Sequence, residues 1–588
     1  MTKVLAFSPY AAWRVHANFE TTFTRACQSR GAEVKHILCN EVFAECDASN
    51  STGTPKGRSA EVCRWCQSEA KLAIEEAGLP YEWLGKYIKP EEQRSIVAWA
   101  QSLRPEEFAE TSFDGFPIGP CVCTSLGSYF RTFPIRLDDW QTSNIFRGFL
   151  HGAAQTYVGL KRVFEEWQPD ALVLFNGRMS MTRVAITLAK QQGLRVLVHE
   201  APRTPGTVFV IENDHIVSAA PVRHFWQAWA GVPLTRPQLE QVAGWLADRR
   251  YGRSGPGIFK FAASPQGADD LKANLGLEGR KLVAIFNSST DESAGDPDII
   301  PAFPSQEDWI DRLVEWAARR PECGMVIRVH PCLAGQFGIP TAHSQIEWFE
   351  ALQARLPANV RVVMPDEPLS SYDLMDAADL GLTYGSTAGL EMFALGKPMV
   401  AVPGYSLYAD AGLPGLILTG DPETLESQMD QALDLRPSRE FQRAAFRYIY
   451  RYYFHMQMPF PLVSMVEQFE SRLSYDSLEA LKPGADAALD RICGFLLDGQ
   501  PIYAGPNDAT LELTTADEDE FFDRIAADPA WLANIRTVPA TSPAPVGDKA
   551  QEAVRKTLLH LFVRVLRRSI PERVRLRLRQ AWQSSPSP

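Results

Sequence analysis

The feature that most constrains this chain is a regular alternation of short apolar runs with helical stretches, which occurs twice. The apolar runs of the first half lie at residues 3–7, 34–38, 171–175 and 195–199. Those of the second half lie at residues 282–286, 324–329, 361–364, 379–384 and 399–402. Strand–helix–strand alternation requires right-handed crossovers and produces a parallel sheet. The sequence therefore predicts an α/β protein with two doubly wound domains.

Domain boundaries follow from size and from breaks in this pattern. One hydrophobic core stops growing at about 250–300 residues, whereas the chain has 588. The glycine-rich segment 252–257 predicts a flexible joint, and residues 538–546, rich in Pro, Thr, Ser and Ala, are typical of a linker. The domains expected are 1–255, 256–480, an extension with linker at 481–550, and a tail at 551–588.

Charge is distributed unevenly along the chain. The net charge is −12, but residues 551–588 hold nine Lys/Arg against two Asp/Glu, so the rest carries −19. An acidic body argues against nucleic-acid binding, which needs a basic footprint. The tail has apolar residues at helical spacing among its arginines. It is expected either to lie on an anionic membrane surface or to pack on the acidic body or a partner subunit.

The cysteines bear on location and on metal binding. No segment approaches the roughly 20 apolar residues that span a bilayer, and residues 1–9 predict a buried strand instead of a signal peptide. We therefore expect a cytoplasmic protein, peripheral at the inner membrane if the tail binds lipid, with mostly reduced thiols. Cys39, Cys46, Cys63 and Cys66 cluster in a loop-like region with the spacing C-x6-C-x16-C-x2-C. This spacing suits a structural zinc site, and the alternatives are scattered thiols or a loop that orders on acceptor binding.

Polar residues follow the predicted strands of the second domain, where parallel sheets bind ligands. Asn287 and Ser288 come after the run 282–286, and their side chains can donate to phosphate oxygens or simply form a turn. Arg328 and His330 end the run 324–329, and the imidazole can donate to a leaving phosphate.

The strongest segment is 379–404. A strand there ends in Gly-Ser-Thr and opens a helix, so Ser386 and Thr387 lie where free amides and the helix dipole favour a phosphate. Glu391, about one turn further on, can accept hydrogen bonds from ribose hydroxyls. The competing interpretation is a capping Ser/Thr with an incidental glutamate.

In the first domain, Asn176-Gly177-Arg178 follows a buried run. The glycine permits a tight turn, and Arg178 would reach a cleft between the domains. A guanidinium there suits an anionic sugar or a phosphate, because it binds both in bidentate fashion. Alternatively, Arg178 donates hydrogen bonds to backbone carbonyl groups of a helix.

Together these motifs resemble the capsule polysaccharide biosynthesis family of GT-B glycosyltransferases, which includes Kdo transferases. The His-Pro and Ser/Thr elements are also similar to motifs of bacterial sialyltransferases. The resemblance covers residues 280–415 well and is looser over 13–46, 176–178 and 199–200. Its residues are Arg328-Val329-His330-Pro331, Ser386 to Glu391, Gly396-Lys397-Pro398 and Gly404 to Leu413.

The resemblance implies a GT-B fold, two Rossmann-like domains facing a cleft, and assigns roles to residues. His330 would contact the donor phosphate beside Ser386 and Thr387, and Glu391 would hold the ribose or base. The acidic-acidic-glycine motif that carries the base in sialyltransferases is not evident here. Glu20 and Glu200 are the candidates for the catalytic base, each with a surface or capping carboxylate as its alternative.

The function expected is transfer of a sugar, with a CMP-linked acidic sugar such as Kdo or a nonulosonic acid as donor, to a glycan or lipid-linked acceptor. The donor would bind the second domain and the acceptor the first. No cofactor is required if His330, the Ser/Thr turn and the helix dipole neutralise the leaving phosphate. The alternatives are a nucleotide-sugar epimerase of the same fold and a non-catalytic scaffold of a polysaccharide assembly complex.

Overall fold

A computed structural model describes residues 1–528 apart from 12, 53–59, 132–134, 205, 254–270, 290–294, 297, 300–301, 336–340 and 468–469. Contacts within the chain group Met1–Ala540 as one compact unit and Thr541–Pro588 as a second. The predicted linker at 538–546 and tail at 551–588 lie outside the described residues. Within the described part, no helix is both long and apolar enough to cross a membrane.

The first sheet has seven strands in the order β13-β6-β5-β4-β1-β2-β3. Its five strands from β3 to β5 pair in parallel, and β6 and β13 extend it in antiparallel fashion. The strands are β1 (Lys3–Ser8), β2 (Glu33–Leu38), β3 (Tyr81–Trp83), β4 (Ala171–Phe175), β5 (Arg195–Glu200), β6 (Thr207–Glu212) and β13 (Gln457–Pro459).

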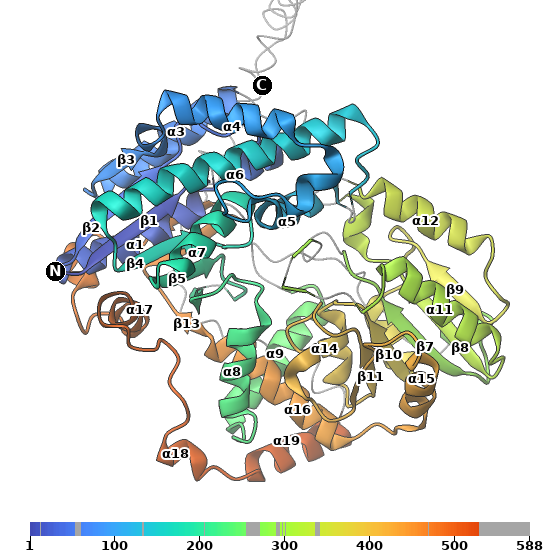
Figure 1. Ribbon diagram of the computed structural model, residues 1–588. Helices are drawn as coiled ribbons and strands as arrows, with labels where there is room; N and C mark the ends of the chain where they lie inside the picture. The colour runs from blue at the N-terminus through green and yellow to red at the C-terminus, as the bar shows by residue number, and fades with distance from the viewer. Residues whose placement is uncertain are drawn as a thin grey trace, which may run out of the picture. The chain divides into compact units, whose positions relative to one another are not determined.

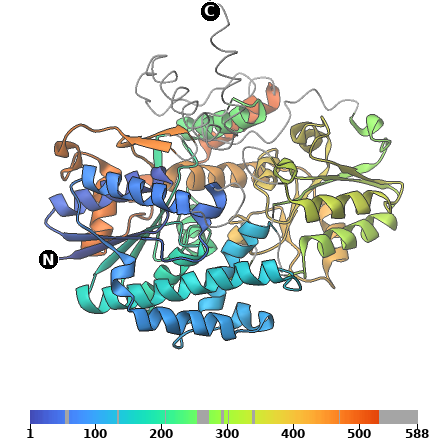
Figure 2. The same ribbon diagram turned by 90° about the horizontal axis from the view of Figure 1, so that it is seen from above.

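Helices cover both faces of this sheet (Figures 1 and 2). Successive side chains of a strand point to opposite faces, so Val4 and Ala6 pack with α1 and α17, whereas Leu5 and Phe7 pack with α6 and α7. This two-sided burial explains why the strands are continuous apolar runs. The helices of this half are α1 (Arg14–Ser29), α2 (Asp47–Thr52), α3 (Ala60–Glu76), α4 (Pro90–Ser102), α5 (Ile118–Phe130), α6 (Trp140–Trp167), α7 (Ser180–Gln191), α8 (Ala219–Trp229) and α9 (Arg236–Arg250).

The second sheet has six parallel strands in the order β12-β11-β10-β7-β8-β9. This is the doubly wound order in which the direction of winding reverses between β7 and β10. Val283 and Ile285 of β7 face α11, and Leu282 and Ala284 face the side of α14 and α16. The strands are β7 (Lys281–Phe286), β8 (Cys323–Arg328), β9 (Val360–Val363), β10 (Leu380–Thr383), β11 (Met399–Ala401) and β12 (Leu416–Leu418). The helices are α10 (Leu271–Asn274), α11 (Gln306–Ala318), α12 (His343–Gln353), α13 (Ser371–Ala377), α14 (Ala388–Phe393) and α15 (Leu425–Asp434).

The two doubly wound sheets confirm the predicted α/β architecture of the GT-B type. The apolar runs named above coincide with β1, β2, β4, β5 and β7–β11 to within two residues at each end. Cys63 and Cys66 lie on α3 instead of in a loop.

The chain after the second sheet returns to the first, which the predicted boundary at 480 does not anticipate. Strand β13 pairs with β6, and α17 packs against α1. Glu518 of α19 accepts hydrogen bonds from Arg447 of α16. Strand β13 has only three residues and ends in proline, so it is too short to show an alternating pattern in the sequence. The elements are α16 (Arg439–Tyr450), β14 (Val463–Glu467), β15 (Glu470–Leu473), α17 (Ala487–Asp498), α18 (Asp508–Leu511) and α19 (Ala516–Ala527).

Candidate functional site

A pocket opens at the carboxyl ends of β7 and β10, where doubly wound sheets bind their ligands. Its empty space, which includes open solvent at the mouth, is about 880 Å³. Both halves of the chain contribute to its walls. The residues that line it are Arg203, Val217, Ser288, Ser289, Ile299, Tyr384, Gly385, Thr387, Leu390, Gly404, Tyr405, Ser406, Leu407, Tyr408, Tyr448, Tyr452 and Tyr453.

Ser288 presents a hydroxyl to this pocket. The side chain of Gln306 holds its backbone at both ends, accepting from the Ser288 N–H at 2.7 Å and donating to the Ser288 carbonyl at 3.1 Å. The Ser288 side chain is 9% exposed, and its Oγ has no hydrogen-bond partner within the described structure. A buried hydroxyl without a partner is costly, so this atom is well placed to bond a ligand.

His330 lies beside the pocket at the end of β8. Its backbone N–H donates to Asn287 Oδ1 at 2.6 Å, which ties the ends of β7 and β8 together. Its Nδ1 accepts from the N–H of Cys332 at 3.2 Å, at the start of the 3₁₀ turn Pro331–Ala334. With Nδ1 accepting, the neutral ring carries its proton on Nε2. His330 can therefore act as a hydrogen-bond donor through Nε2.

Of the predicted pair at the start of α14, Thr387 lines the pocket and is exposed. Ser386 has a local role, since its Oγ accepts from the N–H of Ala388 at 3.2 Å and its carbonyl accepts from Tyr408 Oη at 2.6 Å. The capping interpretation thus describes Ser386, while Thr387 keeps a side chain on the pocket wall.

Glu391 is buried in an ion pair. Its Oε1 accepts from Nε and a terminal nitrogen of Arg249 at 3.0 and 2.8 Å, and its Oε2 accepts from Tyr372 Oη at 2.9 Å. Arg249 belongs to α9, so this contact joins the first half of the chain to the second sheet. The family resemblance implies that the Glu391 carboxylate binds the ribose. In this structure the carboxylate binds Arg249 instead.

Replacing Glu391 with alanine is expected to lower the free energy of unfolding by about 3 kcal/mol, because it leaves the Arg249 cation without its buried partner. Tyr372→Phe, which removes one hydrogen bond, should cost about 1 kcal/mol. Chemical denaturation of both variants measures this. Unchanged stability of Glu391→Ala together with weakened nucleotide binding would instead support the ribose role.

A group of tyrosines that the sequence analysis did not select forms much of the pocket. Tyr452 and Tyr453 lie on the π-helical turn Arg451–His455, which continues α16, and π-helical turns occur frequently at functional sites. Burial raises the pKa of Tyr452 to about 12, so its hydroxyl stays protonated and can donate. In the sequence, the concentration of tyrosines at 448–453 and 405–408 is the feature that could have pointed to these pocket residues.

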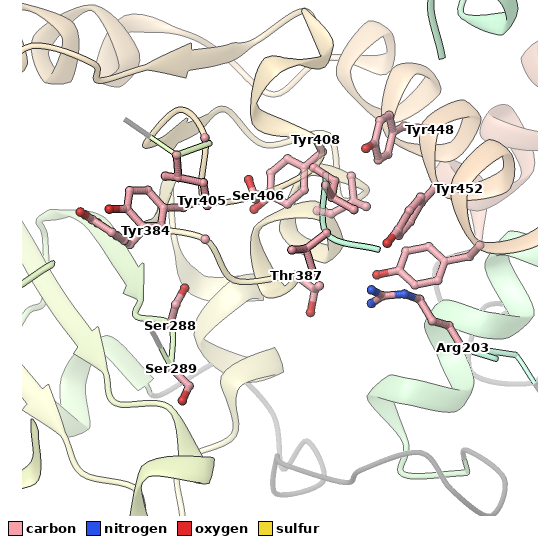
Figure 3. A pocket seen from close by; sticks show the side chains of 17 residues that line it. Arg203, Ser288, Ser289, Tyr384, Thr387, Tyr405, Ser406, Tyr408, Tyr448 and Tyr452 are labelled. Carbon is pink, nitrogen blue, oxygen red and sulfur yellow. The ribbon is translucent and has the colours of Figure 1, made fainter. Parts of the chain in front are cut away.

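Two arginines of the first half reach the same region. The Arg203 guanidinium lies 5.4 Å from the ring centre of Tyr452 and lines the pocket. Figure 3 shows Ser288 and Ser289 on one side, Arg203 and Tyr452 on the other, and Thr387 between them. Arg131 is 3% exposed and donates to Ser289 Oγ at 2.8 Å and to the Cys332 carbonyl at 3.4 Å. No local pattern marks either arginine, because each acquires its position from a distant contact.

Glu20 lies in a buried polar cluster at the carboxyl end of the first sheet. It is 2% exposed, and it accepts from Ser8 Oγ and pairs with His199 Nε2 at 3.1 Å. The His16 ring stacks on Phe175, and burial lowers the pKa of His16 well below its usual range. His16 is therefore neutral at physiological pH.

Glu200, at the end of β5, is the second candidate base. Its Oε2 accepts from Asn176 Nδ2 at 2.6 Å, and its Oε1 accepts from the N–H of Ala201 at 2.9 Å. Burial raises the pKa of this carboxyl, although both hydrogen bonds oppose the shift. Unlike Glu20, Glu200 is only half-buried. Asn176 adopts a left-handed conformation, φ 64°, which turns the chain at this point.

The remaining predicted side chains have structural partners. Arg178 is buried and donates to Ser128 Oγ at 3.1 Å. Arg328 is also buried and donates to the carbonyl of Met364, which places its guanidinium towards β9. Neither is among the residues that line the pocket at β7 and β10.

An Asp-x-Asp pair not considered above brings a second group of potential metal ligands together. Ligand atoms of His215, Asp296 and Asp298 lie within 4.8 Å of one another. Arg183 donates to Asp298 at 2.6 Å and to Asp296 at 3.4 Å, so one cationic side chain already pairs with both carboxylates. A hydrogen bond from His215, together with Arg183, lowers the pKa of Asp298 well below its usual range.

Comparisons with known proteins were made at three levels. No family model matches the sequence, and no curated protein matches it significantly. Among solved structures, the spinosyn rhamnosyltransferase SpnG complexed with spinosyn aglycone is 15% identical over 78% of this chain and 98% of its own, with a TM-score of 0.25. The beta Kdo 2,4 transferase KpsC of Thermosulfurimonas dismutans is 16% identical over 48% and 79%, with a TM-score of 0.30. UDP-GlcNAc 2-epimerase of Methanocaldococcus jannaschii is 10% identical over 76% and 98%, with a TM-score of 0.26. At these scores the likeness does not distinguish between transfer and epimerisation.

Proposed function

We propose that this protein is a glycosyltransferase that moves a sugar from a nucleotide-sugar donor to a glycan or lipid-linked acceptor. The observation that carries the proposal is the pocket at the winding reversal of the second sheet, in whose wall Ser288 has a buried hydroxyl without a hydrogen-bond partner among the described residues. Thr387, the tyrosine hydroxyls and Arg203 add donors around the same space. This set of hydroxyls and cations suits a phosphorylated, hydroxyl-rich ligand.

In this proposal the donor nucleotide occupies the pocket with its phosphate towards Ser289 and His330. The Nε2–H of His330 and the guanidinium of Arg131 then oppose the negative charge that develops on the leaving phosphate. These groups, with the N-terminal turn of α14, supply positive potential without a divalent cation. Asp296 and Asp298, which bind Arg183, have no assigned role in the chemistry.

The acceptor is proposed to bind the first half of the chain, where Glu200 and Arg178 follow neighbouring strands. Glu200 is the better base of the two candidates, because the residue is only half-buried, whereas Glu20 is 2% exposed and already bound to Ser8 and His199. The base would accept a proton from the acceptor hydroxyl as the new glycosidic bond forms.

A cytidine nucleotide is expected to raise the melting temperature more than uridine, thymidine or guanosine nucleotides do. The choice of cytidine rests on the motif resemblance around His330 and Ser386-Thr387. A ligand at about 100 times its Kd adds about 2.7 kcal/mol of stability, which thermal-shift measurements detect. Without ligand, Ser288→Ala should melt at or slightly above the wild type, because it removes a buried hydroxyl without a partner. It should bind the nucleotide about fivefold more weakly, the loss of one hydrogen bond.

A larger shift with a uridine, thymidine or guanosine nucleotide would replace the cytidine assignment. No shift with any nucleotide would contradict the proposed donor site. Incubation of a nucleotide sugar with and without acceptor then separates transfer from epimerisation, because an epimerase changes the donor sugar with no acceptor present. A non-catalytic scaffold would bind the nucleotide sugar but would neither transfer nor epimerise the sugar.

Attachment to a membrane is proposed from the sequence alone. Residues 551–588 carry a net +7 beside a body of −19, so they supply the concentrated positive charge that an anionic lipid surface attracts. Such an attachment would keep the enzyme near lipid-linked acceptors at the inner membrane.

A further inference from the structure

The four cysteines with the spacing C-x6-C-x16-C-x2-C gather around one small cavity. Cys39 follows β2, Cys46 precedes α2, and Cys63 and Cys66 lie in the first turns of α3. All four are free thiols and line the same space with Phe43, Ala48 and Val62. Three separate segments of the chain therefore bring their thiols to a common point.

The backbone beside two of these thiols is arranged for a thiolate. Glu41 adopts a left-handed conformation, φ 63°, which a glutamate rarely takes. In the turn that results, the N–H groups of Glu41 and Val42 donate to the sulfur of Cys39, and the N–H of Ser49 donates to the sulfur of Cys46. Backbone N–H groups aimed at sulfur stabilise the negative charge that a thiolate bears when it binds a metal.

Helix α3 supplies the other two thiols. Cys63 and Cys66 are three residues apart on α3, and residues at this spacing lie on one face of a helix. A bound dication would offset the mutual repulsion of the thiolates that these four residues form when they bind it.

We propose that Cys39, Cys46, Cys63 and Cys66 bind one structural Zn²⁺ that clamps the end of β2 to α3. Four thiols are a donor set that prefers tetrahedral zinc or an iron–sulfur cluster. Binding would release four thiol protons to solvent and leave a Zn(Cys)₄ centre of charge −2. No three of the four sulfur atoms yet lie within 4.8 Å of one another, so the metal would draw them together across the cavity.

This site would support the acceptor side of the proposed enzyme without taking part in transfer. Asp47, next to Cys46, accepts from Tyr10 Oη at 2.8 Å and from Ser180 Oγ at 3.1 Å, at the carboxyl ends of β1 and β4. A metal that fixes Cys46 therefore also fixes the neighbouring Asp47. The inference rests on the cysteine geometry and stands whether or not the proposed transfer is correct.

Elemental analysis of the full-length protein is the test. We expect about one zinc per chain, loss of most of it in Cys66→Ser, and full retention in Cys123→Ser, a control at a buried thiol of α5. If Cys66→Ser does not fold, cobalt substitution of the wild type decides, because a tetrahedral thiolate site gives sulfur-to-cobalt charge-transfer bands. Metal-free protein, iron with sulfide in place of zinc, or a cobalt spectrum without thiolate bands would overturn the proposal.

Discussion

Replacing His330 with alanine is expected to lower the turnover number for sugar transfer by about 10²–10³-fold, the usual effect of removing one donor to a developing charge. In the structure Nδ1 of His330 accepts from the N–H of Cys332, so a neutral ring carries its proton on Nε2. The loss should appear in the turnover number more than in nucleotide affinity, because the charge on the phosphate grows as the bond to the sugar breaks.

Alanine also removes the acceptor for Cys332, so a second variant is needed. His330→Asn keeps a side-chain oxygen close to the backbone for this capping bond but has no donor at the position of Nε2. It should lose activity like His330→Ala while melting close to the wild type. His343→Ala, at an exposed histidine of the same half, is the matched control and should be neutral. Activity of His330→Asn within a few-fold of wild type would show that His330 is only structural.

Replacing Glu200 with glutamine is expected to lower kcat/KM by about 10²–10⁴-fold, the range for a general base. The pH profile gives a sharper signature. Only the ionised carboxylate accepts a proton, and burial raises the pKa of Glu200. Activity of the wild type should therefore fall as the pH drops through a value above the usual glutamate pKa of about 4.3. Glu200→Gln should lose this acidic limb along with the rate.

Glu20→Gln is the matched control for that measurement. Because Glu20 is buried against Ser8 and His199, its loss should reduce stability and leave the acidic limb of the surviving activity in place. An acidic limb that persists in Glu200→Gln at near wild-type rate would move the base to another residue. Glu200→Gln keeps the shape of the side chain but only one acceptor oxygen for the two donors, Asn176 Nδ2 and the N–H of Ala201. Melting curves of the variant therefore accompany the assay.

Much of the second sheet was predictable, and the reason lies in its burial. Strands covered on both faces must be apolar throughout, so β7, β8 and β10 stand out as continuous runs, and a parallel sheet places their carboxyl ends at one edge. That reasoning led to Ser288, His330 and Thr387, which the structure places on or beside the pocket. It did not distinguish Ser386 from Thr387, because which hydroxyl caps the helix depends on side-chain rotation.

What the sequence by itself determined is thus local: the two sets of strands, the edge at which ligands bind, and the spacing of four thiols. Only the tertiary structure decided which partners meet across long separations. Arg249 reaches Glu391 over 142 residues, Arg131 reaches Ser289 over 158, and β13 returns to β6 from the far end of the chain. Such contacts follow from the packing of whole helices and sheets, and a local pattern of residue types does not predict them. The arginines and tyrosines of the pocket come from this packing, because a side chain's role there depends on what faces it, not on its neighbours in sequence.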